Sequence, residues 1–223
     1  MTAHLILLAV SYLLGSVPFG YLVAKAVAGV DVRTVGSGNI GASNVRRAAG
    51  NVAGAVVLVL DIAKGFVPAF FFAGWFFPSV PATTAGVACG LGAILGHIFS
   101  VFMKFRGGKG VATGCGVAFG LAPKEAAIAL AAFLVVVAIW RYISLGSMSA
   151  AVVFLVSLVL LAKDPWGEGL AVTLFAGAMA ALVIARHRSN IQRLLAGSEH
   201  KLGEDRHTGP PAGAQGAGGS SDS

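Results

Sequence analysis

The chain has 223 residues, of which 57% are hydrophobic and only 11% are charged. Ordinary soluble proteins carry about 25% charged residues, and the 31 glycines follow no three-residue period, so soluble and collagen-like classes are excluded. The mean hydropathy of +0.84 and the net charge of +7 indicate a membrane protein whose basic loops face anionic lipid or anionic substrates rather than nucleic acid.

Seven apolar segments approach the roughly 17–25 residues that a helix needs to cross a bilayer. They cover residues 5–27, 52–77, 82–102, 111–121, 126–140, 147–162 and 170–185. The fourth is short, and merging short segments would leave five or six spans. We therefore predict an all-α, polytopic membrane bundle of about seven transmembrane helices. Cys89 and Cys115 lie in apolar segments and are expected to pack as small hydrophobic residues.

The positions of the basic residues predict the orientation of the bundle. Thirteen of the 16 Lys and Arg residues fall in alternate loops, the opposite loops hold only Lys124 and Lys163, and Lys64 lies inside the second segment. The positive-inside rule then places the richer side in the cytoplasm and the N-terminus outside. Residues 1–202 are predicted to form the membrane domain. The Gly-, Pro- and Ser-rich stretch 203–223 is predicted to be a disordered cytoplasmic tail.

The first cytoplasmic loop, residues 36–47, reads GSGNIGASNVRR. Glycines and small polar residues can turn backbone N–H groups toward an anion, and an arginine can clamp a phosphate with two parallel hydrogen bonds. The alternative is a flexible turn whose arginines only set the topology. The match to G-x-G-x-x-G does not indicate dinucleotide binding, because that pattern needs a strand–turn–helix unit.

The second cytoplasmic loop, residues 104–113, reads KFRGGKGVAT. Three glycines around Lys109 would allow a close backbone approach to phosphate, although the loop is not a Walker A motif because Gly110 follows the lysine. The alternative is a tight turn with lysines that reach toward water. His97 lies near the inner end of the preceding segment, where it is either a binding candidate or a packing residue.

The third cytoplasmic stretch, residues 186–199, reads RHRSNIQRLLAGSE. His187, Asn190 and Arg193 follow one another at i, i+3 spacing, so they share one face of a helix that leaves the membrane. An ordinary basic juxtamembrane helix is the alternative. The loop residues Ser144 and Ser147 could add hydroxyl donors.

Two charged residues, Asp61 and Lys64, lie inside the second apolar segment at i, i+3 spacing. A charge at a helix centre costs roughly 2.5–3.5 kcal/mol on insertion scales, so such residues are candidates for function. Mutual pairing that fixes the bundle is the alternative. Together with the three basic loops, these features predict a phosphate site beside lipid. Acyl transfer onto a phosphorylated head group and transport of an organic phosphate both fit that prediction.

At the three loops the chain resembles the bacterial acyl-phosphate:glycerol-3-phosphate acyltransferase family (PlsY type). The family's motifs are Gly-Ser-Gly-Asn with a downstream Asn and Arg, a Gly-His stretch ending in Gly-Gly-Lys-Gly, and His-x-x-Asn-Ile-x-Arg-Leu with a later Gly-x-Glu. All three occur here in order. Ile40 and Ser100 stand where proline is frequent, and Ser43 where threonine is frequent; none of these departures removes a polar group that the chemistry needs.

The resemblance implies transfer of a fatty acyl group from acyl phosphate to the 1-hydroxyl of sn-glycerol 3-phosphate. The products would be 1-acylglycerol 3-phosphate (lysophosphatidic acid) and phosphate, the first acylation of phospholipid synthesis. Because phosphate is a good leaving group, such an enzyme mainly positions two phosphorylated partners and neutralises charge. No cofactor and no metal are expected.

The resemblance also implies roles for particular residues. The expected catalytic residues are Ser37, Arg47, Lys109, His187 and Asn190. The expected substrate-binding residues are Asn39, Asn44, Gly107, Gly108, Gly110, Ser144, Ser147, Asp61, Lys64, His97, Arg193 and Glu199. The three glycines would offer backbone N–H groups to phosphate, and Glu199 would order the third motif. Either His187 or the substrate's own phosphate would remove the hydroxyl proton.

The family also implies a bacterial inner-membrane monomer whose active site faces the cytoplasm. It would make transient contact with the enzyme that supplies acyl phosphate, and no contact with nucleic acid. A rival pattern, His-x-x-x-x-Asp from His200 to Asp205, is typical of acyltransferases that use thioester donors, but it lies where the chain turns into the predicted tail. A transporter would usually show internal repeats and a binding site at the membrane midplane. Here no repeat is evident, and the polar motifs cluster at one membrane face, so acyl transfer is favoured over transport.

Overall fold

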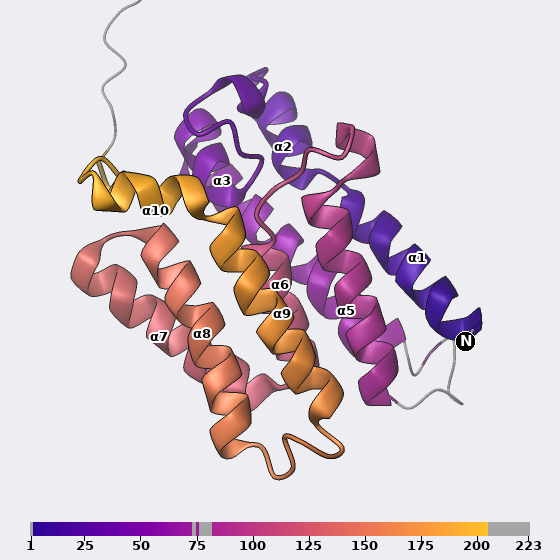
Figure 1. Ribbon diagram of the computed structural model, residues 1–223. Helices are drawn as coiled ribbons and strands as arrows, with labels where there is room; N and C mark the ends of the chain where they lie inside the picture. Colours follow the sequence, from indigo (N-terminus) through magenta and orange to yellow (C-terminus); the bar gives the residue numbers. More distant parts are fainter. Residues whose placement is uncertain (1, 73–74, 76–81, 205–223) are drawn as a thin grey trace, which may run out of the picture.

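The computed structural model describes residues 2–72, 75 and 82–204, with the side chains of residues 2–4 left out of that description. Within these residues every regular element is helical, as Figure 1 shows, which confirms the all-α prediction. The elements are α1 (Thr2–Ser16), α2 (Phe19–Ala28), η1 (Val32–Thr34), α3 (Ala42–Val67), η2 (Pro68–Phe72), α5 (Ala82–Ile98), η3 (Val101–Met103), α6 (Val111–Leu121), α7 (Pro123–Trp140), α8 (Ile143–Leu161), α9 (Leu170–Arg186) and α10 (Arg188–Leu195).

Each predicted apolar segment coincides with a helix, but fewer than seven helices are long enough to cross a membrane. Five segments of the described chain qualify by length and composition, namely Leu5–Ala28, Ala42–Phe72, Ala82–Met103, Pro123–Trp140 and Ile143–Leu161. A sixth is obtained if α9 and α10, which meet at an angle of 57°, count as one span. The short α6 is only about 17 Å long at 1.5 Å per residue, against about 30 Å of hydrocarbon.

Several helix boundaries differ from the sequence prediction. Helix α7 begins at Pro123 rather than at residue 126, and α8 begins at Ile143 rather than at residue 147, so Ser144 and Ser147 lie on a helix rather than in the predicted loop. The first span consists of two helices, because Pro18 lacks an N–H group and disfavours the helical conformation at the preceding Val17. The third helix begins at Ala42 rather than near residue 52, and Gly50, with φ +92°, introduces a kink within it. Most of the predicted stretch 73–77 lies outside the described residues.

Glycines bring the helices into close contact. A Cβ atom at Gly96 of α5 would lie 2.1 Å from the carbonyl oxygen of Tyr12 in α1. One at Gly116 of α6 would lie 2.0 Å from the carbonyl oxygen of Ile62 in α3. Small residues at such crossings let helix backbones approach closely in a membrane. Cys89 is fully buried in α5, as expected of a small hydrophobic residue.

A hydrophobic cluster joins the segments that carry the first two motifs. Buried Val32 of η1 and Ile40 of the first loop pack with Ala24 of α2, Val45 of α3 and Met103 of η3. Figure 1 shows α2, the start of α3 and α10 at one end of the bundle, and the connection between α8 and α9 at the opposite end. The fold therefore gathers the three motif segments at one end of the molecule.

Candidate functional site

In the first motif, a single amide organises the loop. The Asn44 Oδ1 atom accepts the Ser37 backbone N–H at 3.1 Å and an Arg47 guanidinium N–H at 3.4 Å. Its Nδ2 atom donates to the carbonyl oxygens of Val32 and Val35, each at 2.9 Å. Asn44 is only 1% exposed, and both ends of its amide are bonded to protein. Its hydrogen bonds therefore hold the exposed residues Ser37 and Arg47 in position.

The glycines of the first motif serve this arrangement. Gly36 has φ +57°, and a Cβ atom there would lie 2.5 Å from the Asn44 Oδ1 atom. Asn39 is half-buried two residues beyond Ser37. Since α3 begins at Ala42, Asn44 and Arg47 stand on a helix rather than on the predicted loop.

The second motif is anchored through the backbone of its glycines. The Gly107 N–H donates to the Ile98 carbonyl at 2.9 Å, and the Gly108 N–H donates to the His97 carbonyl at 3.0 Å. These two N–H groups are therefore used within the protein, contrary to the expectation that they would bind phosphate. A Cβ atom at Gly108 would lie 2.1 Å from His97 Nε2, so this glycine allows the loop to pack on the imidazole. Gly110, with φ +83°, precedes α6.

Lys109 connects the second motif to the third. Its Nζ atom donates to Asn190 Oδ1 on α10. The pKa of Lys109 is lowered to about 8, chiefly by burial; nearby arginines contribute to the lowering, and the Glu199 carboxylate opposes it. The arginines that act on Lys109 are Arg193, Arg186 and Arg47, one of which comes from the first motif. All three motifs thus contribute to one group of positive charges.

Glu199 is the hub of the third motif. One carboxylate oxygen accepts Asn190 Nδ2 at 2.6 Å and Ser144 Oγ at 2.7 Å, and the other accepts Arg193 Nε at 2.6 Å. Burial acts to raise the pKa of Glu199, but these three hydrogen bonds outweigh it and lower the pKa. The ionised carboxylate therefore orients Asn190 toward Lys109. Ser147, by contrast, donates to Ile143 in its own helix.

His187 occupies the junction between α9 and α10. It is 3% exposed, and its Nδ1 atom lies 2.8 Å from the Val183 carbonyl oxygen. Because a carbonyl oxygen can only accept, we assign the hydrogen to Nδ1, which leaves Nε2 as the acceptor of the neutral ring. Arg186, the preceding residue, donates to the Gly108 carbonyl at 3.1 Å and so ties the end of α9 to the glycine loop. No feature of the sequence indicates this contact.

Asp61, Lys64 and His97 form a separate buried cluster. The Lys64 Nζ atom lies 2.8 Å from Asp61 Oδ1 and donates to the Val17 carbonyl at 2.9 Å, where α1 and α2 meet. His97 Nδ1 lies 3.7 Å from the same carboxylate oxygen. These contacts favour the alternative in which the charges pair to fix the bundle. The cluster reaches the candidate site through His97, on which Gly108 packs.

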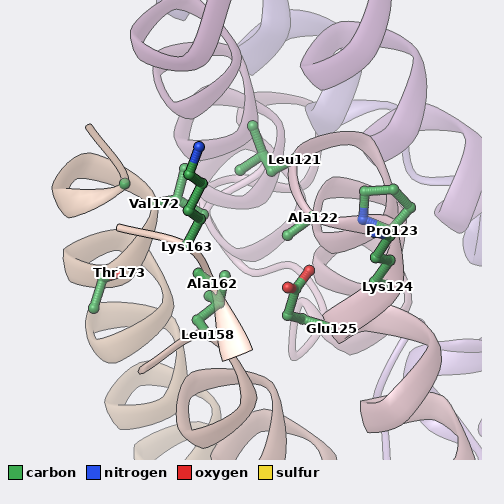
Figure 2. A pocket seen from close by; sticks show the side chains of 11 residues that line it. Leu121, Ala122, Pro123, Lys124, Glu125, Leu158, Ala162, Lys163, Val172 and Thr173 are labelled. Atoms are coloured by element: carbon green, nitrogen blue, oxygen red, sulfur yellow. The ribbon is translucent and has the colours of Figure 1, made fainter. Parts of the chain in front are cut away.

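A cavity of about 350 Å³ lies at the other end of the same helices. Figure 2 shows its lining, which comes from the end of α6, the start of α7, the end of α8 and the start of α9, with Glu125 and Lys163 among its polar side chains. No residue of the three motifs lines it. Among the described residues, no group of three or more His, Cys, Asp or Glu side chains is arranged to hold a metal ion.

Known proteins match this chain over almost its whole length, apart from its two ends. A family model for glycerol-3-phosphate acyltransferase matches residues 5–197. The glycerol-3-phosphate acyltransferase of Geotalea daltonii is 44% identical over 200 residues, covering 90% of this chain and 98% of the relative. That of Myxococcus xanthus is 46% identical over 202 residues, covering 91% and 100%.

Two solved structures are also similar to this chain. The crystal structure of PlsY (YgiH), an integral membrane glycerol 3-phosphate acyltransferase, in its glycerol 3-phosphate form has a TM-score of 0.80 and 42% identity, and covers 90% of this chain and 96% of that one. The lysophosphatidic acid form has a TM-score of 0.78 and 40% identity, and covers 90% and 95%.

Proposed function

This chain belongs to the glycerol-3-phosphate acyltransferase family, and we propose that it acylates the 1-hydroxyl of sn-glycerol 3-phosphate with a fatty acyl phosphate as donor. The products are lysophosphatidic acid and inorganic phosphate. The forms in which the related PlsY was solved, with glycerol 3-phosphate and with lysophosphatidic acid, support this acceptor and this product.

The observation that carries the proposal is the contact of Lys109 with Asn190, which joins the second and third motifs at a site rich in positive charge. Both proposed substrates carry phosphate groups, and the leaving group is itself a phosphate. A partly desolvated group of cations stabilises such charges more strongly than water does. A phosphate leaving group also makes a covalent acyl-enzyme intermediate unnecessary.

In the proposed reaction the substrate 1-hydroxyl oxygen attacks the acyl carbonyl carbon. The new ester C–O bond forms, the bond between the acyl carbon and the phosphate oxygen breaks, and phosphate leaves with the electron pair. Lys109 and Arg47 bind phosphate groups, and Ser37 and Asn39 hydrogen-bond to substrate. The His187 Nε2 atom accepts the hydroxyl hydrogen bond, and the proton passes either to it or to the substrate's own phosphate. We propose that binding is the larger part of the role of His187.

The proposed setting is the bacterial inner membrane, with the site facing the cytoplasm. The charge asymmetry supports this orientation, because the sequence pattern assigns 13 of the 16 Lys and Arg residues to the motif side. Glycerol 3-phosphate would then reach the site from the cytoplasm, and acyl phosphate from the bilayer or from the enzyme that produces it.

The test is an acylation assay with purified full-length protein and labelled glycerol 3-phosphate in mild detergent or lipid. Palmitoyl phosphate, palmitoyl-CoA and palmitoyl acyl carrier protein are offered separately. We expect labelled lysophosphatidic acid with palmitoyl phosphate alone. Product from either thioester would contradict the proposed donor. If labelled glycerol 3-phosphate entered lipid vesicles that contain this protein alone, and no donor gave product, the result would support transport instead of acylation.

A further inference from the structure

The end of the described chain returns to a turn that carries none of the three motifs. Residues 197–204, here called the C-terminal strap, run from the end of α10 to the connection between α7 and α8, which Figure 1 shows close to α10. Arg141 donates from Nε and Nη2 to the Leu202 carbonyl oxygen at 3.0 and 2.6 Å. The Leu202 N–H donates back to the Arg141 carbonyl at 2.6 Å. We call this reciprocal contact the clasp.

The backbone conformation of Arg141 indicates that the side chain at this position has a specific use. Its φ is +62°, and its N–H donates to the Val137 carbonyl, so it ends α7 in the left-handed conformation. Glycine takes this conformation at the lowest cost and is the commonest residue there. An arginine at this position therefore provides something that glycine cannot, and the contact that its side chain makes is the clasp.

The strap carries the hub of the third motif. Glu199 lies three residues before Leu202, between Gly197 at φ +65° and Gly203 at φ +86°. Besides the hydrogen bonds of Glu199, the strap is held on the α10 side by the Ser198 N–H, which donates to the Arg193 carbonyl at 2.8 Å. On the other side of Glu199 it is held by the clasp, with the Lys201 ammonium 5.8 Å from the Tyr142 ring centre. The clasp therefore limits how far this short irregular segment can move and keeps Glu199 close to Asn190.

We propose that Arg141 and Leu202 position Glu199, and through it Asn190 and Lys109, for the binding of glycerol 3-phosphate. This inference rests on the proposed function. Arg141 is a positioning residue, because the observed hydrogen bonds of its side chain are to the strap. Without the clasp, the hydrogen bonds of Glu199 must work against a larger conformational entropy of the strap, so Glu199 holds the Asn190 amide less firmly.

The test compares Arg141→Gly, which suits the left-handed backbone and removes the side chain, with Arg188→Ala, which removes an exposed arginine of α10. We expect Arg141→Gly to raise the KM for glycerol 3-phosphate about tenfold, with the KM for acyl phosphate within about twofold of wild type. Arg188→Ala should keep both constants. Arg141→Lys should recover only part of the loss, because an ammonium lacks the planar fork of the guanidinium.

Leu202→Pro removes the N–H that completes the clasp from the other side. If the two residues act together, the double variant Arg141→Gly/Leu202→Pro should have about the same KM as the worse single variant. An unchanged KM in Arg141→Gly would overturn the proposal, as would independent effects that multiply in the double variant. A lowered melting temperature with normal kinetics would show a purely structural role and would also overturn it.

A calorimetric titration with glycerol 3-phosphate alone separates this proposal from the reaction. If wild type binds glycerol 3-phosphate but turns over no acyl phosphate, the proposed donor fails while the clasp is still tested by the binding constants. Equal dissociation constants for wild type and Arg141→Gly would overturn the clasp, whatever the donor.

Discussion

Replacing Asp61 alone should destabilise the bundle more than replacing Asp61 and Lys64 together. Their side chains are 3% and 2% exposed, and the two charges lie 2.8 Å apart within a helix that qualifies as a membrane span. Asp61→Asn leaves the ammonium without its counter-charge, and Lys64→Met leaves the carboxylate without its own. The double variant removes both charges and therefore leaves no uncompensated charge in the bundle.

The magnitude follows from burial and distance. At an effective dielectric constant of about 20, two unit charges at this separation attract by about 6 kcal/mol, much of which offsets their desolvation. Removing one partner of a buried pair costs about 3–5 kcal/mol, close to the roughly 2.5–3.5 kcal/mol of an unpaired charge at a membrane helix centre. His97, 3.7 Å from Asp61, gives limited compensation.

Thermal unfolding in detergent measures the effect. For a chain of about this length, 1 kcal/mol shifts the melting temperature by about 2–4 °C, so each single variant should lose about 6–20 °C. The double variant should lose clearly less than either. The matched control is Asp31→Asn, which breaks an exposed pair with Arg33 and should leave the melting temperature nearly unchanged. A double variant whose loss equals the sum of the two single losses would refute the reasoning.

The remaining predictions concern the second motif. Lys109 is charged below its pKa of about 8, so the KM for glycerol 3-phosphate should rise between pH 7 and pH 9.5, where the substrate phosphate is already a dianion. Lys109→Arg should abolish this rise, because arginine stays charged; the same rise in both proteins would assign it to another group. Gly108→Ala should cost at least tenfold in activity, because its Cβ atom would overlap His97 Nε2. Gly114→Ala, whose Cβ atom would meet its nearest neighbour at 3.7 Å, should be tolerated in the same assay, and equal effects would exclude the packing argument.

The local features of this protein followed from the sequence. Apolar segments became helices, since hydrophobicity and segment length act within one stretch of chain. The three motif loops indicated phosphate binding at one membrane face, because exposed backbone N–H groups, amides and basic side chains can all bind phosphate. The short α6 was also foreseen. Pro18 is a sequence signal for the break between α1 and α2, because proline lacks an N–H group and disfavours the helical conformation at the residue before it.

The sequence by itself thus determined the all-helical membrane architecture and the family, and it singled out the candidate site residues. Only the tertiary structure decided what those residues bond to. The Gly107 and Gly108 N–H groups turn to Ile98 and His97, and Glu199 joins Ser144 to Asn190 across 55 and nine residues of chain. Such partners depend on how helices pack and where a strap returns. A hydrogen bond is set by positions in space to within a fraction of an ångström, and spacing along a sequence does not encode that distance.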